Sequence, residues 1–381
     1  MAAYPFRSWV EVSRQTIADN FHAVRAIVGP GVEVMPVVKA DAYRHGAVEV
    51  SRILVAEGAR WLAVSNVEEG VHLRQAGIGC RILVMADFFP AARPALVEYD
   101  LTPTLHSLED ITALNRLANI LERPLAYHLK IDTGMGRLGT RASAEEIVAC
   151  VQAAKHTRIE GLMTHFASSA DYTSPQTEQQ IDRFRQIVTT LRAAGIRPAF
   201  LHMSSTNPIA YGRAETWLDG QATPMVRPGH AIYGYISPAR GEAPKAILQV
   251  KPALSWKAAI LAIKDVPEGA LIGYGGMCKA QRPMRIAILG AGYADGLPHR
   301  LSNKGRVIAG GRYAPILGAV SMDLTTIDIS QSPQLKVGDA VTIIGREGDV
   351  SQDAQQLART AGTISYSVLC GISVRVKRVY V

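Results

Sequence analysis

The sequence predicts an α/β protein, a (β/α)8 TIM barrel followed by a second, mainly antiparallel β domain at the C-terminus. From about residue 14 to 235, short apolar runs alternate with amphipathic stretches, which is the pattern of βα units around a parallel sheet. Eight such runs fit into about 220 residues, an ordinary size for this barrel. Beyond about residue 245, β-rich runs separated by Gly, Pro and Asp turns take over, as in an antiparallel sheet.

The barrel elements follow from the length and spacing of the apolar runs. A short apolar run bounded by turn residues is typical of a buried strand, whereas apolar residues three and four apart indicate a helix. Thr177–Ala194 shows the helical pattern, because Ile181 and Phe184 begin a series of apolar residues at this spacing. The eighth helix has the weakest signal, since Gly229–Arg240 resembles a loop. The predicted strands are Val34–Val38, Trp61–Val64, Arg81–Met85, Leu101–Leu105, Ala126–Ile131, Ile159–Met163, Ala199–His202 and Pro224–Arg227, and the predicted helices include Ala47–Glu57, Val67–Gln75, Ile111–Leu121, Ala144–Ala154 and Thr177–Ala194.

The second domain is expected to include the start of the chain. Trp9–Val12 is an apolar run that precedes the first barrel helix, and we expect it to pair with the β-rich runs. We therefore predict a barrel of residues 14–245 and a β domain of residues 246–381 together with residues 1–13. The predicted β runs are Leu254–Val266, Met284–Ala291, Arg306–Ala309, Thr325–Ile329 and Ala340–Ile344, followed by a short helix, Gln352–Ala361, and a final strand, Val374–Val381.

Composition and charge limit the classes of function. The chain has 381 residues, of which 48% are hydrophobic and 19% are charged, and its formal net charge is +8. Lys and Arg are scattered, so the charge favours phosphate- or carboxylate-bearing ligands rather than nucleic acid. The four cysteines lack zinc-ligand spacing, and we find neither a secretory signal nor a membrane-spanning run. We expect a cytoplasmic protein with reduced thiols and without metal, membrane or nucleic-acid partners.

Two segments place basic side chains at the C-terminal ends of strands, where barrel enzymes carry their catalytic groups. The first strand ends at Lys39, and a lysine there is costly to desolvate unless it has a task such as forming a Schiff base. A lysine whose amine reaches solvent is the alternative. The fifth strand leads through Lys130 into a glycine-rich loop that projects Arg137, a side chain suited to binding a carboxylate. A plain strand-to-helix turn is the alternative there.

Three later strand ends add polar groups. A histidine follows the sixth strand, and a lone histidine at a strand end is more often a core residue than a ligand. The loops after the seventh and eighth strands commonly bind phosphate in this fold. The candidate residues at these three ends are His165, Ser204, Ser205, Arg227, Gly229 and His230.

Three segments of the β domain carry further candidates. LIGYGG contains Tyr274, GAVSMD contains Met322 and Asp323, and TISYSVLC contains Tyr366. Alone, Tyr274 would be a turn residue in a glycine-rich hairpin and Tyr366 a packed helix residue.

In order, these segments resemble those of the alanine racemases, which depend on pyridoxal 5'-phosphate (PLP), over almost the whole chain. VKADAYRHG is similar to the family's VKANAYGHG, and KIDTGMGRLG, THFA, MVRPG and TISYSVLC are similar to its other characteristic segments. The chain departs from the family at Asp41, where Asn is usual, and at Arg44, where Gly is usual. It also has Ala319, Ser321 and Leu324 where the family reads GRVCMDQ. Because Arg44 replaces a glycine, we expect a negative φ at this residue.

The resemblance implies PLP as the cofactor and assigns roles to individual residues. Lys39 would bind the cofactor, and Arg137 would hold the substrate carboxylate and the cofactor's phenolic oxygen. Lys130, often carbamylated in the family, would orient Arg137. Met322 would present its backbone N–H to the substrate carboxylate, and Asp323 would steady the entrance to the site. The further cofactor contacts that it implies are Tyr43, His165, Ser204, Ser205, Arg227, Gly229, His230 and Tyr366.

Arg227 indicates the reaction type. The resemblance places it at the pyridine nitrogen of PLP, and an arginine there donates a hydrogen bond and keeps its proton. The unprotonated ring is then a weaker electron sink, which disfavours transamination. Lys39 and Tyr274 would act as acid and base on opposite faces of the α-carbon, interconverting L-alanine and D-alanine for cell-wall peptidoglycan. Family members are head-to-tail homodimers in which this tyrosine serves the neighbouring barrel.

Three alternatives stay open. A PLP-dependent amino-acid decarboxylase of the same fold would carry an acidic residue in place of Arg227. A PLP-carrying homeostasis protein resembles the barrel alone and would leave the β domain unexplained. A racemase for serine or a basic amino acid is compatible with Ser204, Ser321 and the long polar stretch Tyr211–Pro224, which lie near the expected entrance.

Overall fold

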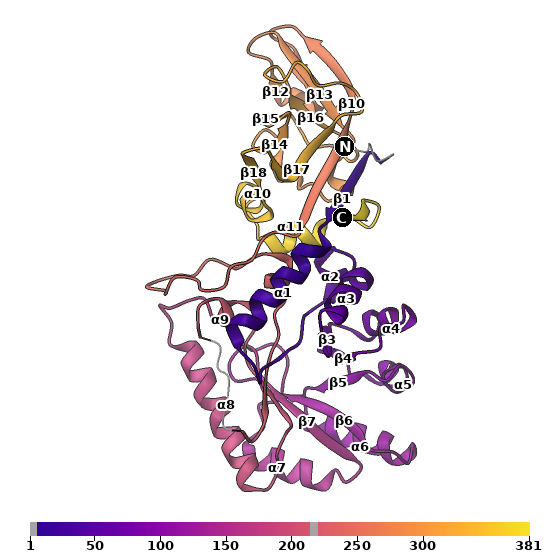
Figure 1. Cartoon of the computed structure of the whole chain (residues 1–381), viewed down its shortest axis with the longest axis vertical. Coiled ribbons are helices and arrows are strands. Elements are labelled where there is room, and N and C mark those ends of the chain that lie inside the picture. The colour runs from indigo at the N-terminus through magenta and orange to yellow at the C-terminus, as the bar shows by residue number, and fades with distance from the viewer. Residues whose placement is uncertain (1–5, 214–219) are drawn as a thin grey trace. The chain divides into compact units, whose positions relative to one another are not determined.

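The fold comes from a computed structural model, which describes residues 6–213 and 220–381. Part of the polar stretch Tyr211–Pro224, residues 214–219, lies outside the described residues. Contacts divide the chain into two units (Figure 1). We call Ile17–Ala42 with Ala47–Lys251 the barrel unit, and Met1–Thr16 with Tyr43–Gly46 and Pro252–Val381 the β unit.

The barrel unit is built on an 8-stranded parallel sheet in the order β2-β9-β8-β7-β6-β5-β4-β3. A bridge between Val37, just after β2, and Ala63 in β3 joins the two ends of this order and closes the barrel. The first strand is shorter than the predicted Val34–Val38, because Pro36 has no N–H to donate to the ladder. The predicted TIM barrel is confirmed. Its strands are β2 (Glu33–Val34), β3 (Trp61–Val64), β4 (Arg81–Val84), β5 (Thr102–Leu105), β6 (Leu125–Lys130), β7 (Thr157–Met163), β8 (Phe200–His202) and β9 (Thr223–Val226).

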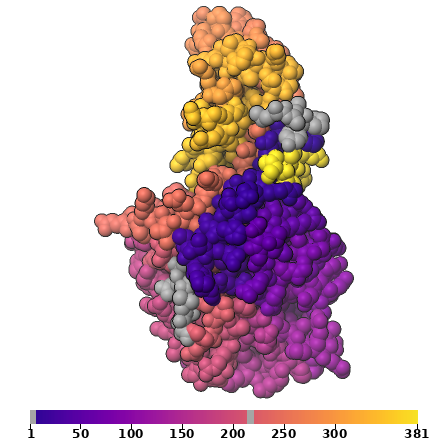
Figure 2. Space-filling view, viewed as in Figure 1, coloured from indigo at the N-terminus to yellow at the C-terminus, as the bar shows by residue number. Residues whose placement is uncertain are grey.

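Amphipathic helices cover the barrel. In the space-filling view, the indigo and purple atoms of α1 and the helices that follow it form one continuous face of this unit (Figure 2). The helix predicted at Ile111 begins earlier, at Leu108, because the Ser107 side chain caps it by accepting from a backbone N–H. After β9 there is only a 3-10 turn, in line with the weak helical signal there. The helices and 3-10 turns are α1 (Arg14–Val28), α3 (Ala47–Ala56), α4 (Val67–Gln75), η1 (Pro90–Ala92), α5 (Arg93–Glu98), α6 (Leu108–Ile120), α7 (Ala144–Ala153), α8 (Gln176–Ala193), α9 (Thr206–Ala210) and η2 (His230–Tyr233).

The segment after β2 departs from the prediction. α2 (Lys39–Tyr43) is a left-handed turn, since φ lies between 52° and 65° at every residue from Ala40 to Arg44. The expected negative φ at Arg44 is therefore wrong: its φ is 65°. A left-handed L-residue costs about 1–2 kcal/mol, so neighbouring contacts must hold this turn. They do so from both ends: Glu69 accepts from the Ala40 amide at 2.6 Å, and Arg378 Nε donates to the Arg44 carbonyl at 2.9 Å.

The β unit is a 9-stranded sheet in the order β18-β17-β14-β15-β16-β13-β10-β1-β19, with a further pairing of β17 and β10. β1 pairs antiparallel with β10 and parallel with β19, so the expected return of Trp9–Val12 into the second domain is confirmed. The remaining pairings are antiparallel, as predicted. The elements are β1 (Ser8–Val12), β10 (Leu254–Val266), β11 (Leu271–Ile272), η3 (Tyr274–Gly276), β12 (Cys278–Lys279), β13 (Met284–Leu289), η4 (Tyr293–Asp295), η5 (His299–Leu301), β14 (Arg306–Ala309), β15 (Arg312–Leu317), β16 (Thr325–Asp328), β17 (Ala340–Glu347), β18 (Val350–Gln352), α10 (Ala354–Ala361), α11 (Ser365–Gly371) and β19 (Lys377–Tyr380).

Within the described ranges, we find no helix with the length and apolar character that crossing a membrane requires.

Candidate active site

The C-terminal end of the barrel concentrates positive charge. Lys130, the last residue of β6, is 6% exposed. Burial and, to a smaller extent, the nearby cations Arg227, Arg137 and Lys39 lower the pKa of its amine to about 8. His165, which follows β7, is neutral because burial and the same cations lower its pKa to about 3. These five side chains are therefore brought together, and the site favours an anionic ligand.

The loop that carries Arg137 is organised by Asp132. One oxygen of this carboxylate accepts from the amides of residues 134–136 at 3.2, 2.9 and 2.9 Å, and the other accepts from Arg141 Nε at 2.7 Å. Burial raises the pKa of Asp132, but these donors outweigh it and lower the pKa to about 2. Gly139 closes the loop, since a Cβ there would lie 2.8 Å from the Asp132 nitrogen. The ionised Asp132 carboxylate thus holds the loop that carries Arg137.

Arg227, just after β9, is a buried donor with several acceptors. Its Nη1 lies 2.9 Å from His202 Nδ1 and 3.0 Å from the His202 carbonyl oxygen. Its Nη2 donates to the Thr164 carbonyl at 2.6 Å and lies 3.4 Å from His165 Nδ1. Burial lowers the pKa of Arg227 to about 10, which leaves it protonated at neutral pH. The side chain is therefore fixed as a cationic donor next to His165.

The loops after β8 and β9 meet around Thr206. The Thr206 hydroxyl accepts from the amides of Gly229 and Ala231, both at 3.2 Å. The amide of Gly229, a predicted phosphate contact, thus has a partner within the protein. Ser204 is fully buried, and its hydroxyl has no hydrogen-bond partner within the described chain. A buried hydroxyl without a partner is costly, so this loop is suited to a ligand with acceptor oxygens. The same loops carry Ser205, which is partly buried, and His230, which is buried.

Two further predicted cofactor contacts belong to the β unit. Tyr43 lies in the left-handed turn and is 7% exposed. Its ring lies 6.0 Å from the ring of Tyr366, which is part of α11. The left-handed turn that follows Lys39 in the chain thus contains one of two neighbouring tyrosines.

The predicted second acid/base also belongs to the β unit. Tyr274 lies in η3 and is 76% exposed. Asn303 links its loop to the loop of Met322: the amide nitrogen donates to the Met277 carbonyl at 2.8 Å, and the amide oxygen accepts from Gly318 N at 2.6 Å. Met322 is 54% exposed. Asn303 therefore joins the two loops by hydrogen bonds, and each loop carries an exposed candidate side chain.

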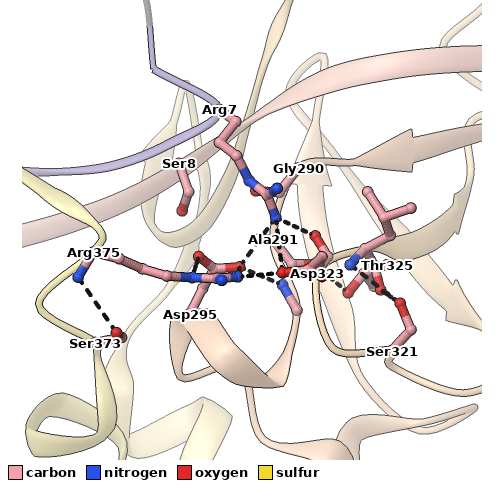
Figure 3. Close-up of polar contacts among 12 residues, drawn as sticks. Arg7, Ser8, Gly290, Ala291, Asp295, Ser321, Asp323, Thr325, Ser373 and Arg375 are labelled. Carbon is pink, nitrogen blue, oxygen red and sulfur yellow. Dashed lines mark hydrogen bonds and ion pairs between the residues drawn. The ribbon is translucent and has the colours of Figure 1, made fainter.

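Asp323 is held by an ion network (Figure 3). Arg375 Nη2 donates to Asp323 Oδ1 at 2.7 Å, and the same guanidinium donates to both oxygens of the buried Asp295 at 2.7 and 2.9 Å. Both carboxylates raise the pKa of Arg375. Arg7 Nη2 donates to the Asp323 backbone carbonyl at 2.5 Å and lies 3.6 Å from Asp295. This network fixes the backbone beside Met322.

The residues at the barrel end fit PLP. The phosphate matches the Ser204 hydroxyl, which is buried without a partner, and the concentrated cations match an anionic ligand. Lys39 supplies the amine that the cofactor's aldehyde requires.

Sequence reasoning missed several residues that position the site. Thr206 and His202 stood next to predicted residues at strand ends, where their side chains were a usable signal. Arg375 and Asp295 gave no local signal, because they lie 80 residues apart in the chain. Asn303 likewise joins loops that are distant in sequence.

Comparisons with known proteins agree with this geometry. The family model described as alanine racemase, N-terminal domain, matches residues 12–238, and that of the C-terminal domain matches residues 253–380. An alanine racemase of Halothermothrix orenii is 41% identical over 98% of this chain and 96% of its own. The structure of an alanine racemase from Streptomyces lavendulae matches with a TM-score of 0.89 and 30% identity over 99% of this chain and 98% of that one. A Bartonella henselae alanine racemase with covalently bound pyridoxal phosphate shares the fold, with a TM-score of 0.84 and 24% identity over 99% of this chain and 100% of that one.

Proposed function

The chain belongs to the alanine racemase family, and from this premise we propose how its residues carry out the reaction. The enzyme interconverts L-alanine and D-alanine and depends on PLP. The bound cofactor supplies an electron sink beside the α-carbon of the amino acid. The protein must then remove a proton from one face of that carbon and return one to the other face.

We assign these two tasks to Lys39 and Tyr274. The Lys39 amine exchanges a proton with one face and the Tyr274 phenol with the opposite face. Arg137, on the loop anchored by Asp132, binds the substrate carboxylate. Met322, beside the Asp323 network, presents its amide to the same carboxylate.

The other predicted contacts hold the cofactor. Arg227 would donate to the pyridine nitrogen, His165 would lie by the ring, and Tyr366 with the loops after β8 and β9 would hold the phosphate. The set of cofactor contacts that we propose is Lys39, Tyr43, His165, Ser204, Ser205, Arg227, Gly229, His230 and Tyr366.

The observation that carries this assignment is the state of Arg227. Its acceptors at hydrogen-bond distance are backbone carbonyl oxygens and histidine nitrogens. These groups hold Arg227 as a cationic donor, whereas the decarboxylase alternative needs an acid at this place. The Ser321 hydroxyl bonds to both the carbonyl and the amide of Leu324, so it is used within its own turn. The hydroxyl thus gives no support to a preference for serine.

The test follows D-alanine formation from L-alanine. Lys39→Ala is expected to lose the cofactor's absorbance band together with activity. Tyr274→Phe should keep the band and lose at least about a hundredfold in rate, the usual scale for a missing acid/base. Tyr313→Phe removes a β-unit tyrosine hydroxyl that bonds to the Ser351 carbonyl, and it serves as the control with wild-type activity. Full activity in Tyr274→Phe would exclude the two-base mechanism.

We further propose that Lys130 is carbamylated. A pKa of about 8 leaves a fraction of this amine neutral at pH 7. A neutral amine adds CO2 to form an N-carboxylate and releases one proton, which replaces a cation in a crowded positive site by an anion beside Arg137. Protein equilibrated with 13C-bicarbonate should show a carbamate NMR signal that is missing in Lys130→Arg. The same signal in that variant would place the modification elsewhere.

The assembly and cell compartment complete the proposal. We assign cofactor binding to a barrel of residues 14–245, and the second acid/base and dimer contacts to residues 246–381 with residues 1–13. Support for a homodimer with shared sites comes from the apolar side chains exposed around the Tyr274 and Met322 loops, because such a patch is typical of an interface. These side chains are Leu271, Tyr274, Met277, Tyr293, Met322 and Leu324. We place the enzyme in the cytoplasm.

A further inference from the structure

Behind Arg227, a row of buried polar groups runs through the barrel. His202 ends β8, His128 lies in β6 and Glu160 lies in β7, and all three are buried. Arg227 Nη1 lies 2.9 Å from His202 Nδ1, and His202 Nε2 lies 2.8 Å from His128 Nδ1. His128 Nε2 lies 3.8 Å from Glu160 Oε2 and has no other partner in the described residues.

Glu160 ends this row near the opposite face of the barrel. Arg81, the first residue of β4, binds both Glu160 oxygens at 2.8 and 2.5 Å. Arg158 adds a contact of 3.1 Å. Burial raises the pKa of Glu160, but His128 and Arg81 outweigh it and lower the pKa well below its usual range. The row therefore ends in a carboxylate.

Elementary hydrogen-bond chemistry gives this row one direction. An arginine only donates, so His202 Nδ1 must accept from Arg227. Burial lowers the pKa of His202, and likewise that of His128, so both rings are neutral. The proton of His202 then sits on Nε2, which makes His128 Nδ1 an acceptor and places the His128 proton on Nε2, facing Glu160.

The packing around His128 is specific for an imidazole ring at this place. A Cβ at Gly161 would lie 2.4 Å from His128 Nδ1, so only glycine at this place in β7 leaves room for the ring. The two imidazole rings meet edge to face with their centroids 4.9 Å apart. Two neutral imidazoles thus join a buried cation to a buried anion.

We propose that Glu160, acting through His128 and His202, is a positioning residue for Arg227. Arg227 sets the tautomers from one end of the row, and Glu160 stabilises the same tautomers from the other end, because the Nε2–H of His128 faces its carboxylate. His202 then keeps an acceptor toward the guanidinium, which would hold this group as a donor toward the cofactor. The N-terminal face of a barrel ordinarily serves stability. Here one carboxylate near that face acts on the reaction site at the other end. The inference rests on the proposed role of Arg227.

The experiment compares two buried carboxylates. Glu33 in β2 is 6% exposed and is paired with Arg60 through one of its oxygens, but it has no part in the row. Glu33→Gln therefore shows the effect of removing a buried carboxylate that is paired with an arginine outside the row. In Glu160→Gln, we expect the Arg81 guanidinium to bind the amide oxygen. The amide NH2 group would then face His128 Nε2, which already carries a proton. The full-length holoenzyme, labelled with 15N-histidine, reports the tautomers by long-range 1H–15N NMR.

We expect protons on Nε2 of both His128 and His202 in the wild type and in Glu33→Gln. In Glu160→Gln these signals should change, and kcat should fall roughly tenfold with little change in KM, as for lost outer-shell partners. A wild-type His202 with its proton on Nδ1 would overturn the proposal, even if Glu160→Gln failed to fold. Unchanged signals and kcat in Glu160→Gln would do the same. The expected tautomers without alanine racemisation in the wild type would instead count against the proposed function.

Discussion

At the scale of single residues, Asp132 shows how one carboxylate organises a loop of the site. It accepts three backbone amides and the Arg141 guanidinium, and so converts a flexible glycine-rich segment into a defined loop. The glycines allow positive φ, which is 145° at Gly134 and 70° at Gly136. Charge-assisted bonds to a carboxylate are stronger than neutral ones, so the loop depends on the ionised form of Asp132.

Asp132→Asn should destabilise the protein by about 1–3 kcal/mol at pH 7, the scale for hydrogen bonds to a buried charged group, and should raise KM for alanine. The folded pKa of Asp132, about 2, lies below its ordinary 3.8. Its stabilisation is therefore present above about pH 4 and is lost as the pH falls toward 2. Urea unfolding of the wild type and of Asp132→Asn should show a smaller difference in unfolding free energy at pH 3 than at pH 6. A difference in unfolding free energy that is the same at both pH values would contradict this role. An equal loss of stability in the control Asp171→Asn would contradict it as well.

Residue roles were predictable where chemistry is carried by one side chain at a strand end. Arg227 is the last residue of a predicted strand and directly follows β9, and an arginine there indicates a donor. Its acceptors were not predictable in the same way, because His202 and the Thr164 carbonyl reach it from other strands. The partners of Asp323 also come from distant parts of the chain, since Arg375 lies 52 residues away and Arg7 lies 316 residues away.

At the scale of elements, the left-handed turn after Lys39 is the part of the fold that local rules miss. Five successive L-residues have positive φ, although left-handed backbone is unfavourable for each of them. Contacts across the fold hold the turn: Glu69 at its start, and Arg378 and the Cys370 carbonyl at Arg44. Sequence rules describe one residue at a time, so they predict a negative φ for a non-glycine residue such as Arg44.

Variants of Arg44 test this conformation in solution. Both Arg44→Gly and Arg44→Ala lose the bond to Cys370, but only glycine is free of strain at a φ of 65°. The glycine variant should therefore be more stable than the alanine variant by about 1 kcal/mol. At Arg52, inside the right-handed helix α3, the order should be reversed by about the same amount. Thermal or urea unfolding of the four variants measures both differences, and the same order at both sites would rule out the left-handed turn.

Most elements were predictable because one pattern dominates each of them. β3, α4, β10 and β14 have the predicted bounds, since each is an apolar run or an amphipathic stretch with clear turn residues at its ends. β15 escaped prediction because its sequence, RYAPIL, contains a proline and begins with an exposed arginine. In the first barrel strand, Pro36 left only two residues in the regular ladder.

At the scale of the whole molecule, the proposed mechanism needs groups from both units. Lys39 belongs to the barrel unit and Tyr274 to the β unit, where it is exposed among other apolar side chains. A homodimer in which each β unit serves the partner's barrel would bury these side chains and complete two equivalent sites. In a symmetric dimer, one interface completes both sites at once.

Mixed dimers test this arrangement. Lys39→Ala and Tyr274→Phe homodimers are each expected to be inactive. In a mixed dimer, the barrel that keeps Lys39 receives the intact Tyr274 from the Lys39→Ala subunit, so one of its two sites is complete. Random pairing of equal amounts should restore about a quarter of the wild-type sites. The measurement is racemase activity after co-expression with two different affinity tags, which also isolates the mixed dimer. If each tyrosine served its own barrel, no site in any dimer would be complete, and purified mixed dimers would be as inactive as the two parents.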